Sequence, residues 1–74
     1  MQAGTYHWIL SLVCVEEGLD GVVRTRYANA ESTVEVKPGG TRQDVYRAVL
    51  AQTVADLKLN LGTTSTLAFI CEPN

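Results

Sequence analysis

The residues of this 74-residue chain that could do chemistry are one histidine, two cysteines and two small clusters of charged residues. His7 has no carboxylate near it in the sequence, although general-base catalysis requires a partner that orients the imidazole. Cys14 and Cys71 each lie in an apolar run, outside any Cys-x-x-Cys motif, and a zinc site requires four ligands. We therefore predict two reduced thiols, no catalytic residue, no metal site and no cofactor, and we expect that the protein is not an enzyme.

The two charged clusters allow a solvated surface or an anion site. Glu16, Glu17 and Asp20 lack the alternating ligands over twelve residues that a calcium loop requires, so a solvated turn is expected. Arg24 and Arg26 share one face of an expected strand. Together with Arg42, Arg47 and the N–H groups of a helix N-terminus, they could bind an anion or a nucleic acid. The formal net charge of −2 and the pI of about 5.1 disfavour a nucleic-acid partner, so this is our alternative hypothesis.

Length and composition indicate one small domain over residues 1–74, because 46% of the residues are hydrophobic and 19% are charged. A chain of this size buries only about 60% of its unfolded surface, so a partner subunit would help its stability. The apolar run at residues 8–15 has no basic region before it, which disfavours a signal peptide. No stretch approaches the roughly 20 apolar residues that span a bilayer, so we expect a cytoplasmic protein without a membrane partner.

Residues 41–60 carry the only clear helical period in the chain. An apolar stripe on one side of this helix is wide enough to face a core; it comprises Val45, Tyr46, Val49, Leu50, Thr53, Val54 and Leu57. Thr41 and Asp44 have the spacing of a capping box at its start. Asn60 or Gly62 is expected to take the left-handed conformation that ends it.

Three strands are expected around this helix. Residues 6–16 are apolar on both faces, which is typical of a central strand, and a hairpin turn follows at residues 16–21. In residues 22–37 the apolar positions change parity between Tyr27 and Val34, which predicts a bulge or break at residues 29–31. Alternatively, residues 22–31 form a wide loop. Residues 65–72 form the last strand, and Pro73 ends it.

The order strand, strand, helix, strand predicts a small β-β-α-β domain of the α+β class. Its three-stranded antiparallel sheet has the order 2-1-3 and packs on one helix. The antiparallel arrangement places Cys14 and Cys71 at opposite ends of the sheet, too far apart for a disulfide. Trp8, rather than Cys14, is then expected beside Cys71.

The segment Thr33-Val34-Glu35-Val36-Lys37-Pro38-Gly39-Gly40-Thr41, followed by Val45 and Val49, resembles the strand–turn–helix step of β-grasp, ubiquitin-like domains. In that family a strand ends in a Pro/Gly turn and a Thr opens the helix. The resemblance covers about a quarter of the chain and implies a protein-binding or carrier module. The tail Glu72-Pro73-Asn74 lacks the di-glycine of conjugated members, so the resemblance does not extend to their chemistry.

One helix can cover only one side of the sheet, so the other side is expected to remain open. If Trp8, Leu10, Leu12, Cys14, Leu67 and Phe69 face the helix, an apolar surface faces away; it consists of Ile9, Val13, Val15, Ala68 and Ile70. Arg24, Arg26, His7 and Ser11 would form its rim, and Tyr27 would point inward. Exposed apolar surfaces of this kind mark partner sites, and the last strand offers an open edge. We therefore predict a protein-interaction module, expected to be a homodimer, whose partner-binding residues are Ile9, Val13, Val15, Arg24, Arg26 and Ile70.

Overall fold

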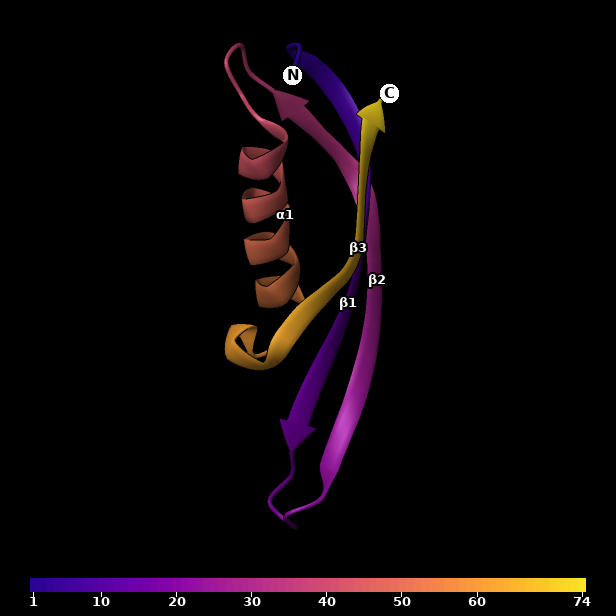
Figure 1. Ribbon diagram of the computed structural model, residues 1–74, viewed down its shortest axis with the longest axis vertical. Coiled ribbons are helices and arrows are strands. Elements are labelled where there is room, and N and C mark those ends of the chain that lie inside the picture. The colour runs from indigo at the N-terminus through magenta and orange to yellow at the C-terminus, as the bar shows by residue number, and fades with distance from the viewer.

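The first strand lies at the centre of the molecule, between the other two strands. The computed structural model describes all 74 residues, which form β1 (Gly4–Glu17), β2 (Val23–Val36), α1 (Arg42–Asp56), the short 3-10 helix η1 (Leu61–Thr63) and β3 (Thr64–Pro73). The sheet is antiparallel with the order β2-β1-β3, and α1 lies on one side of it (Figure 1). The predicted β-β-α-β fold and its strand order are therefore confirmed.

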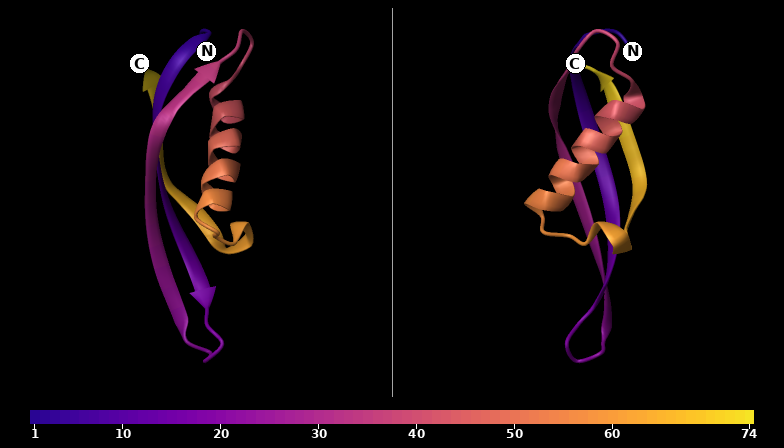
Figure 2. Two further views of the ribbon diagram at one scale, coloured as in Figure 1. Left: turned by 180° about the vertical axis from the view of Figure 1, so that it is seen from behind. Right: turned by 90° about the vertical axis from the view of Figure 1, so that its left-hand side faces the viewer.

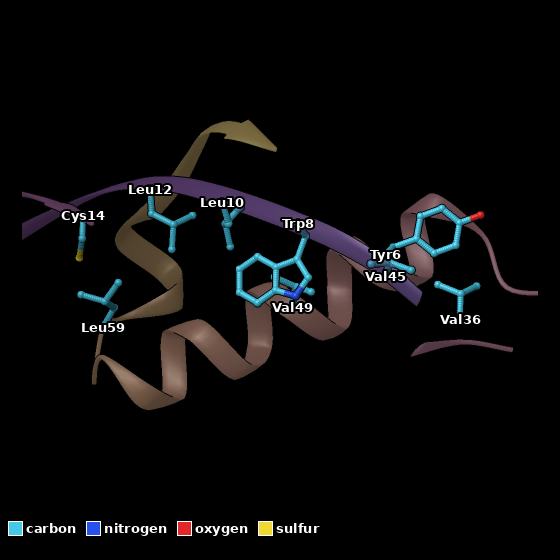
Figure 3. Close-up of a cluster of buried hydrophobic side chains, with 9 residues drawn as sticks. All are labelled: Tyr6, Trp8, Leu10, Leu12, Cys14, Val36, Val45, Val49 and Leu59. Carbon is cyan, nitrogen blue, oxygen red and sulfur yellow. The ribbon is translucent and has the colours of Figure 1, made fainter. Parts of the chain in front are cut away.

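The core lies between α1 and one face of β1. Alternate side chains of a strand point to the same side of the sheet, and on β1 the buried ones are Tyr6, Trp8, Leu10, Leu12 and Cys14. From α1 the buried residues are Val45, Val49 and Thr53, all within the predicted stripe. Figure 3 shows Trp8 over Val49 in the middle of this cluster. The face of β1 and the face of α1 that form the core are those that the sequence predicted.

Strand β2 pairs with β1 without interruption, so the bulge predicted at residues 29–31 and the alternative wide loop are both wrong. The register runs from Gly4 opposite Val36 to Glu17 opposite Val23 with no shift. The apolar parity changes because α1 covers only part of the hairpin. Val34 and Val36 lie under α1, whereas the hairpin end that carries Val23 extends beyond α1 and β3 (Figure 1). In that extension neither face of the sheet is covered, so no buried face constrains the sequence pattern.

The bulge occurs instead in β3. Ser11 pairs with Ala68 and Leu12 with Thr66, so Leu67 is the extra residue that has no partner on β1. Its side chain is 59% exposed, which corrects the expectation that Leu67 faces the helix. Phe69, beyond the bulge, does face the helix, because its ring packs against that of Tyr46 with centroids 5.2 Å apart.

Both ends of α1 have recognisable capping motifs. At the start, the Thr41 hydroxyl accepts a hydrogen bond from the Asp44 N–H, and the Asp44 carboxylate accepts one from the Thr41 N–H. This confirms the predicted capping box. At the end, the helix stops at Asp56, and Lys58, with φ of +54°, takes the left-handed conformation that had been expected of Asn60 or Gly62. Neither the length nor the apolar character of α1 would let it span a bilayer.

Replacing Thr41 with alanine should lower the free energy of unfolding by about 1 kcal/mol. The substitution removes the hydroxyl that accepts from the Asp44 N–H and leaves the rest of the helix unchanged. Urea denaturation of both proteins would measure the difference. Thr41→Ser, which keeps the hydroxyl, is the matched control and should remain within about 0.5 kcal/mol of the wild type.

Candidate protein-interaction surface

The side of the sheet opposite α1, which we name the open face, is not covered by any element of the chain (Figure 2). Directly opposite residues of antiparallel strands point to the same side. The register therefore places Ile9 beside Ile70 of β3, and Val13 beside Tyr27 of β2. Val15 follows Val13 on the same side of β1. The structure thus brings together, on the open face, the four apolar residues predicted to bind a partner.

The apolar residues of the open face form two groups rather than one. Ile9 and Ile70 form the first group, and Val13, Val15 and Tyr27 form the second. Ser11 lies between the groups, with Asn29 and Ala68 as its neighbours. Ile70, Val15 and Tyr27 are 47%, 45% and 74% exposed, so an interface here would remove appreciable apolar area from water.

Tyr27 is therefore on the opposite side of the sheet from the one expected. Alternate residues of a strand share a face, so Tyr27 lies on the same face of β2 as Val23 and Thr25. In the structure that face of β2 belongs to the open face. The exposed phenol ring is the largest apolar side chain on the open face. The sequence did not assign Tyr27 to this face, because the pattern of a single strand does not reveal which of its two faces is covered.

The two arginines predicted for the rim lie on the other side of the sheet. Arg26 is opposite Cys14, and Arg24 is opposite Glu16, so both point to the side on which α1 packs. Arg26 forms an ion pair with Glu16 at 3.1 Å. Arg24 forms one with Asp20 at 3.0 Å, and this guanidinium, followed by the Val22 N–H, lowers the pKa of the Asp20 carboxyl.

Three of the four arginines considered for an anion site do not converge, and the fourth, Arg47, is exposed on α1. Arg24 and Arg26 are bound to carboxylates in the hairpin extension of β2, at one edge of the sheet. Arg42 is at β3, the other edge, where its guanidinium stacks over the Phe69 ring at 4.9 Å and donates to the Phe69 carbonyl oxygen at 2.7 Å. At the N-terminus of α1, the capping box already occupies the N–H of Asp44.

His7 does have a carboxylate partner, which the sequence did not indicate. Its Nε2 atom lies 3.3 Å from a carboxylate oxygen of Glu31, across the β1–β2 pair and on the open face. Both side chains are largely exposed, at 41% and 68%. The two residues are 24 positions apart in the sequence, so only the strand register brings them together. This pair forms a polar part of the open face beside Ile9.

The two thiols have different surroundings at opposite ends of the sheet, as predicted. Cys71 is paired with Trp8, and Cys14 with Thr64. The Cys14 sulfur lies 3.5 Å from the Thr63 hydroxyl, and hydrogen bonds from Thr64 and Thr63 lower the pKa of this thiol. Burial raises the pKa of Cys71, although the nearby charge of Arg42 opposes the effect. Cys14 is only 1% exposed, so the easier ionisation does not make it accessible to a reagent.

The two sheet edges differ in their availability. At β3, a strand that added to the edge would meet the bulge at Leu67 and would compete with Arg42 for the Phe69 carbonyl. Strand β2 is 14 residues long and contains neither a bulge nor a proline. The last strand is an edge of the sheet, as predicted, but the unobstructed edge is β2.

No protein-family model, no curated protein and no solved structure matches this chain. The His, Cys, Asp and Glu side chains form no group of three that could hold a metal ion.

Proposed function

We propose that the protein is a non-enzymatic interaction module that associates with a second copy of itself through the open face. The observation that carries the proposal is the pairing of apolar side chains on the side of the sheet that α1 leaves bare. Ile9 lies beside Ile70, and Val13 beside Tyr27, with Val15 next along β1. Apolar side chains grouped on an uncovered surface are typical of interfaces between proteins.

The small core supports the same proposal. Only 10 of the 74 residues are buried, and nine of them are apolar. A domain of this size has little apolar burial to offset the conformational entropy that it loses on folding. Packing the open faces of two copies against each other would add a second apolar layer, with the two sheets about 10 Å apart as in a β-sandwich.

The dimensions of the sheet limit how tight such a dimer can be. Three strands spaced about 4.8 Å apart give a width of about 14 Å, and a 14-residue strand is about 46 Å long. The full face therefore offers about 600 Å² per copy, and the third strand pairs with only part of β1. A standard stable interface buries about 800 Å² per partner. We therefore expect a reversible dimer that forms in the micromolar concentration range.

The variant Val13→Asp should convert the dimer to the 8.0 kDa monomer in sedimentation equilibrium or light scattering. Val13 lies on β1, the central strand of the open face, and dimerisation would bury the new carboxylate without a partner, at a cost of several kcal/mol. Ala51→Asp, which adds the same charge on the exposed side of α1, is the control and should remain dimeric. Circular dichroism would establish that each variant is folded.

A second variant keeps the test informative if Val13→Asp does not fold. Val15 is 45% exposed, so Val15→Asp should leave the monomer folded and still weaken association by at least tenfold. A wild-type protein that is monomeric at several hundred micromolar would contradict the proposal. So would a dimer that survives both substitutions.

The alternative of anion or nucleic-acid binding has less support. Arg24 and Arg26 are each bound to a carboxylate, and both lie away from Tyr27, the aromatic ring on which a base could stack. We therefore favour the protein interface over a phosphate-binding surface.

A further inference from the structure

A second surface, independent of the open face, lies between α1 and the outer edge of β2. Figure 2 shows that α1 crosses the sheet diagonally, from the side of β3 at its start to beyond β2 at its end. The end of the helix therefore overhangs the position that a fourth strand would occupy beside β2. Under this overhang lies a groove of about 470 Å³, bordered along its length by residues 29–34 of β2. We name this space the β2–α1 groove.

Small side chains on β2 leave the groove empty. Ala30 and Ser32 line the groove and face α1, because they pair with Leu10 and Trp8. Apolar surface lines the interior, from Trp8 and Val34 on the sheet and from Val49 and Leu57 on the helix. A medium-sized apolar side chain in the groove would contact apolar residues of both the sheet and the helix. The space between α1 and the sheet is therefore filled by side chains over β1 but not at the edge formed by β2.

The groove runs beside unused main-chain hydrogen-bonding groups. Because β2 is an edge strand, every second residue presents its N–H and C=O groups outward. β2 has no bulge or proline, so these groups lie in a regular row. An extended chain can add to such an edge through main-chain hydrogen bonds, while alternate side chains enter pockets at the side. This geometry suits an extended peptide better than a helix or a compact small molecule.

The charged residues that line the groove are both acidic. They are Glu31, whose carboxylate pairs with His7 on the open face, and Asp56 at the end of α1. Asp56 is the last residue of α1, and the last turn of the helix contains no basic residue. The partial negative charge of a helix C-terminus therefore adds to that of the carboxylate. A basic side chain of a partner would complement this end of the groove.

We infer that the β2–α1 groove binds an extended peptide of a partner protein by strand addition to β2. The peptide places a medium-sized apolar side chain in the groove and a Lys or Arg two residues away, on the same side, beside Asp56. This proposal goes beyond self-association, because it uses the edge of β2 and the helix side of the sheet rather than the open face.

The test begins with selection from a displayed library of random octapeptides against the intact protein. The expected result is enrichment of sequences in which an apolar residue and a Lys or Arg are separated by one residue. Enriched peptides without a basic residue, or no enrichment, would contradict the proposal. The enriched peptide is then made synthetically and titrated while backbone amide signals are recorded by NMR. Amides of residues 29–34 should shift, and those among them that point away from β1 should become protected from hydrogen exchange.

Two substitutions in exposed positions locate the site. Ser32→Leu fills the groove, and Asp56→Lys reverses its charge; each should weaken peptide binding by about tenfold or more. Thr25→Leu introduces the same side chain elsewhere on β2, at an exposed position that lies outside the groove and points to the open face, and should leave binding unchanged. Equal losses in Ser32→Leu and Thr25→Leu would contradict the assignment of the site.

The same titration separates this proposal from self-association. The variant Val13→Asp, which lacks the proposed dimer interface, should bind the peptide as the wild type does. If the β2 amides that point away from β1 are already protected at high protein concentration without peptide, the edge is occupied by a second copy, and the peptide site is wrong. Shifts confined to the open face would also overturn it.

Discussion

Replacing Leu10 with alanine should lower the free energy of unfolding by about 3 kcal/mol. Leu10 has no solvent exposure and lies between α1 above it and Ala30 and Phe69 on the neighbouring strands. The substitution removes apolar contacts and leaves a cavity that a central strand, held on both sides, cannot close. At about 0.1 kcal/mol per residue, the stability of a 74-residue domain is about 7 kcal/mol, so the variant would lose nearly half of it.

The measurement is urea denaturation followed by fluorescence, because the chain contains one tryptophan, and Trp8 is buried in the same cluster. A thermal scan should show a decrease in Tm of about 15 °C. Leu67→Ala is the matched control. It makes the same chemical change at the bulge, where the side chain is 59% exposed, and should change stability by less than about 0.5 kcal/mol. Equal effects of the two substitutions would contradict the core described here.

Leu59→Ala should have the second largest effect on the stability of the fold, lowering the free energy of unfolding by about 2 kcal/mol. Leu59 lies outside the helix, yet it is only 8% exposed and closes one end of the core next to Cys14 (Figure 3). A Schellman motif holds it there: the Leu59 N–H donates to the Val54 carbonyl at 3.0 Å, and the Lys58 N–H donates to that of Ala55. The left-handed backbone of Lys58 turns the chain so that Leu59 points back to the sheet.

The control for Leu59 is Leu61, two positions further along and 59% exposed. Leu61→Ala should change the free energy of unfolding by less than about 0.5 kcal/mol. Both substitutions would be measured by the same urea denaturation. If Leu59→Ala proves as mild as Leu61→Ala, the segment after α1 does not pack as the structure indicates.

The elements of this fold were predictable because their signals are local. The 3.6-residue period of α1, the capping box of Thr41 and Asp44, and the apolar alternation of β1 each lie within one short segment. The strand order followed from the doubly apolar character of β1, which only a central strand requires. The pairing of Trp8 with Cys71 then followed from the strand directions alone.

The end of α1 shows where local signals were insufficient. Asn60 and Gly62 are more usual in the left-handed conformation than a lysine, so the sequence favoured them. In the structure Lys58 adopts it, at a conformational cost of about 1 kcal/mol. Burial of Leu59 against Cys14, 45 residues earlier in the chain, offsets this cost. Because Leu59 and Cys14 are far apart in the sequence, no local pattern indicates their contact.

The residues of the candidate surfaces were also predictable only in part. Ile9, Val13, Val15 and Ile70 were placed on the open face because they alternate with the core residues of β1 and β3. The side predicted for Tyr27, Arg24 and Arg26 was wrong, because α1 and β3 cover only part of the hairpin and β2 lacks a buried face in its extension.

By itself, the sequence determined the succession of helix and strands, the start of the helix, the order of the strands, and which face of β1 is buried. Periodicity, helix capping and turn formation depend on residues that are close in the sequence, so they can be predicted from the sequence. Tertiary structure alone decided the position of the bulge at Leu67, the His7–Glu31 pair, the burial of Leu59 and the groove between β2 and α1. Each of these depends on how far α1 extends across the sheet and at what angle, and that is set by packing between residues distant in the sequence.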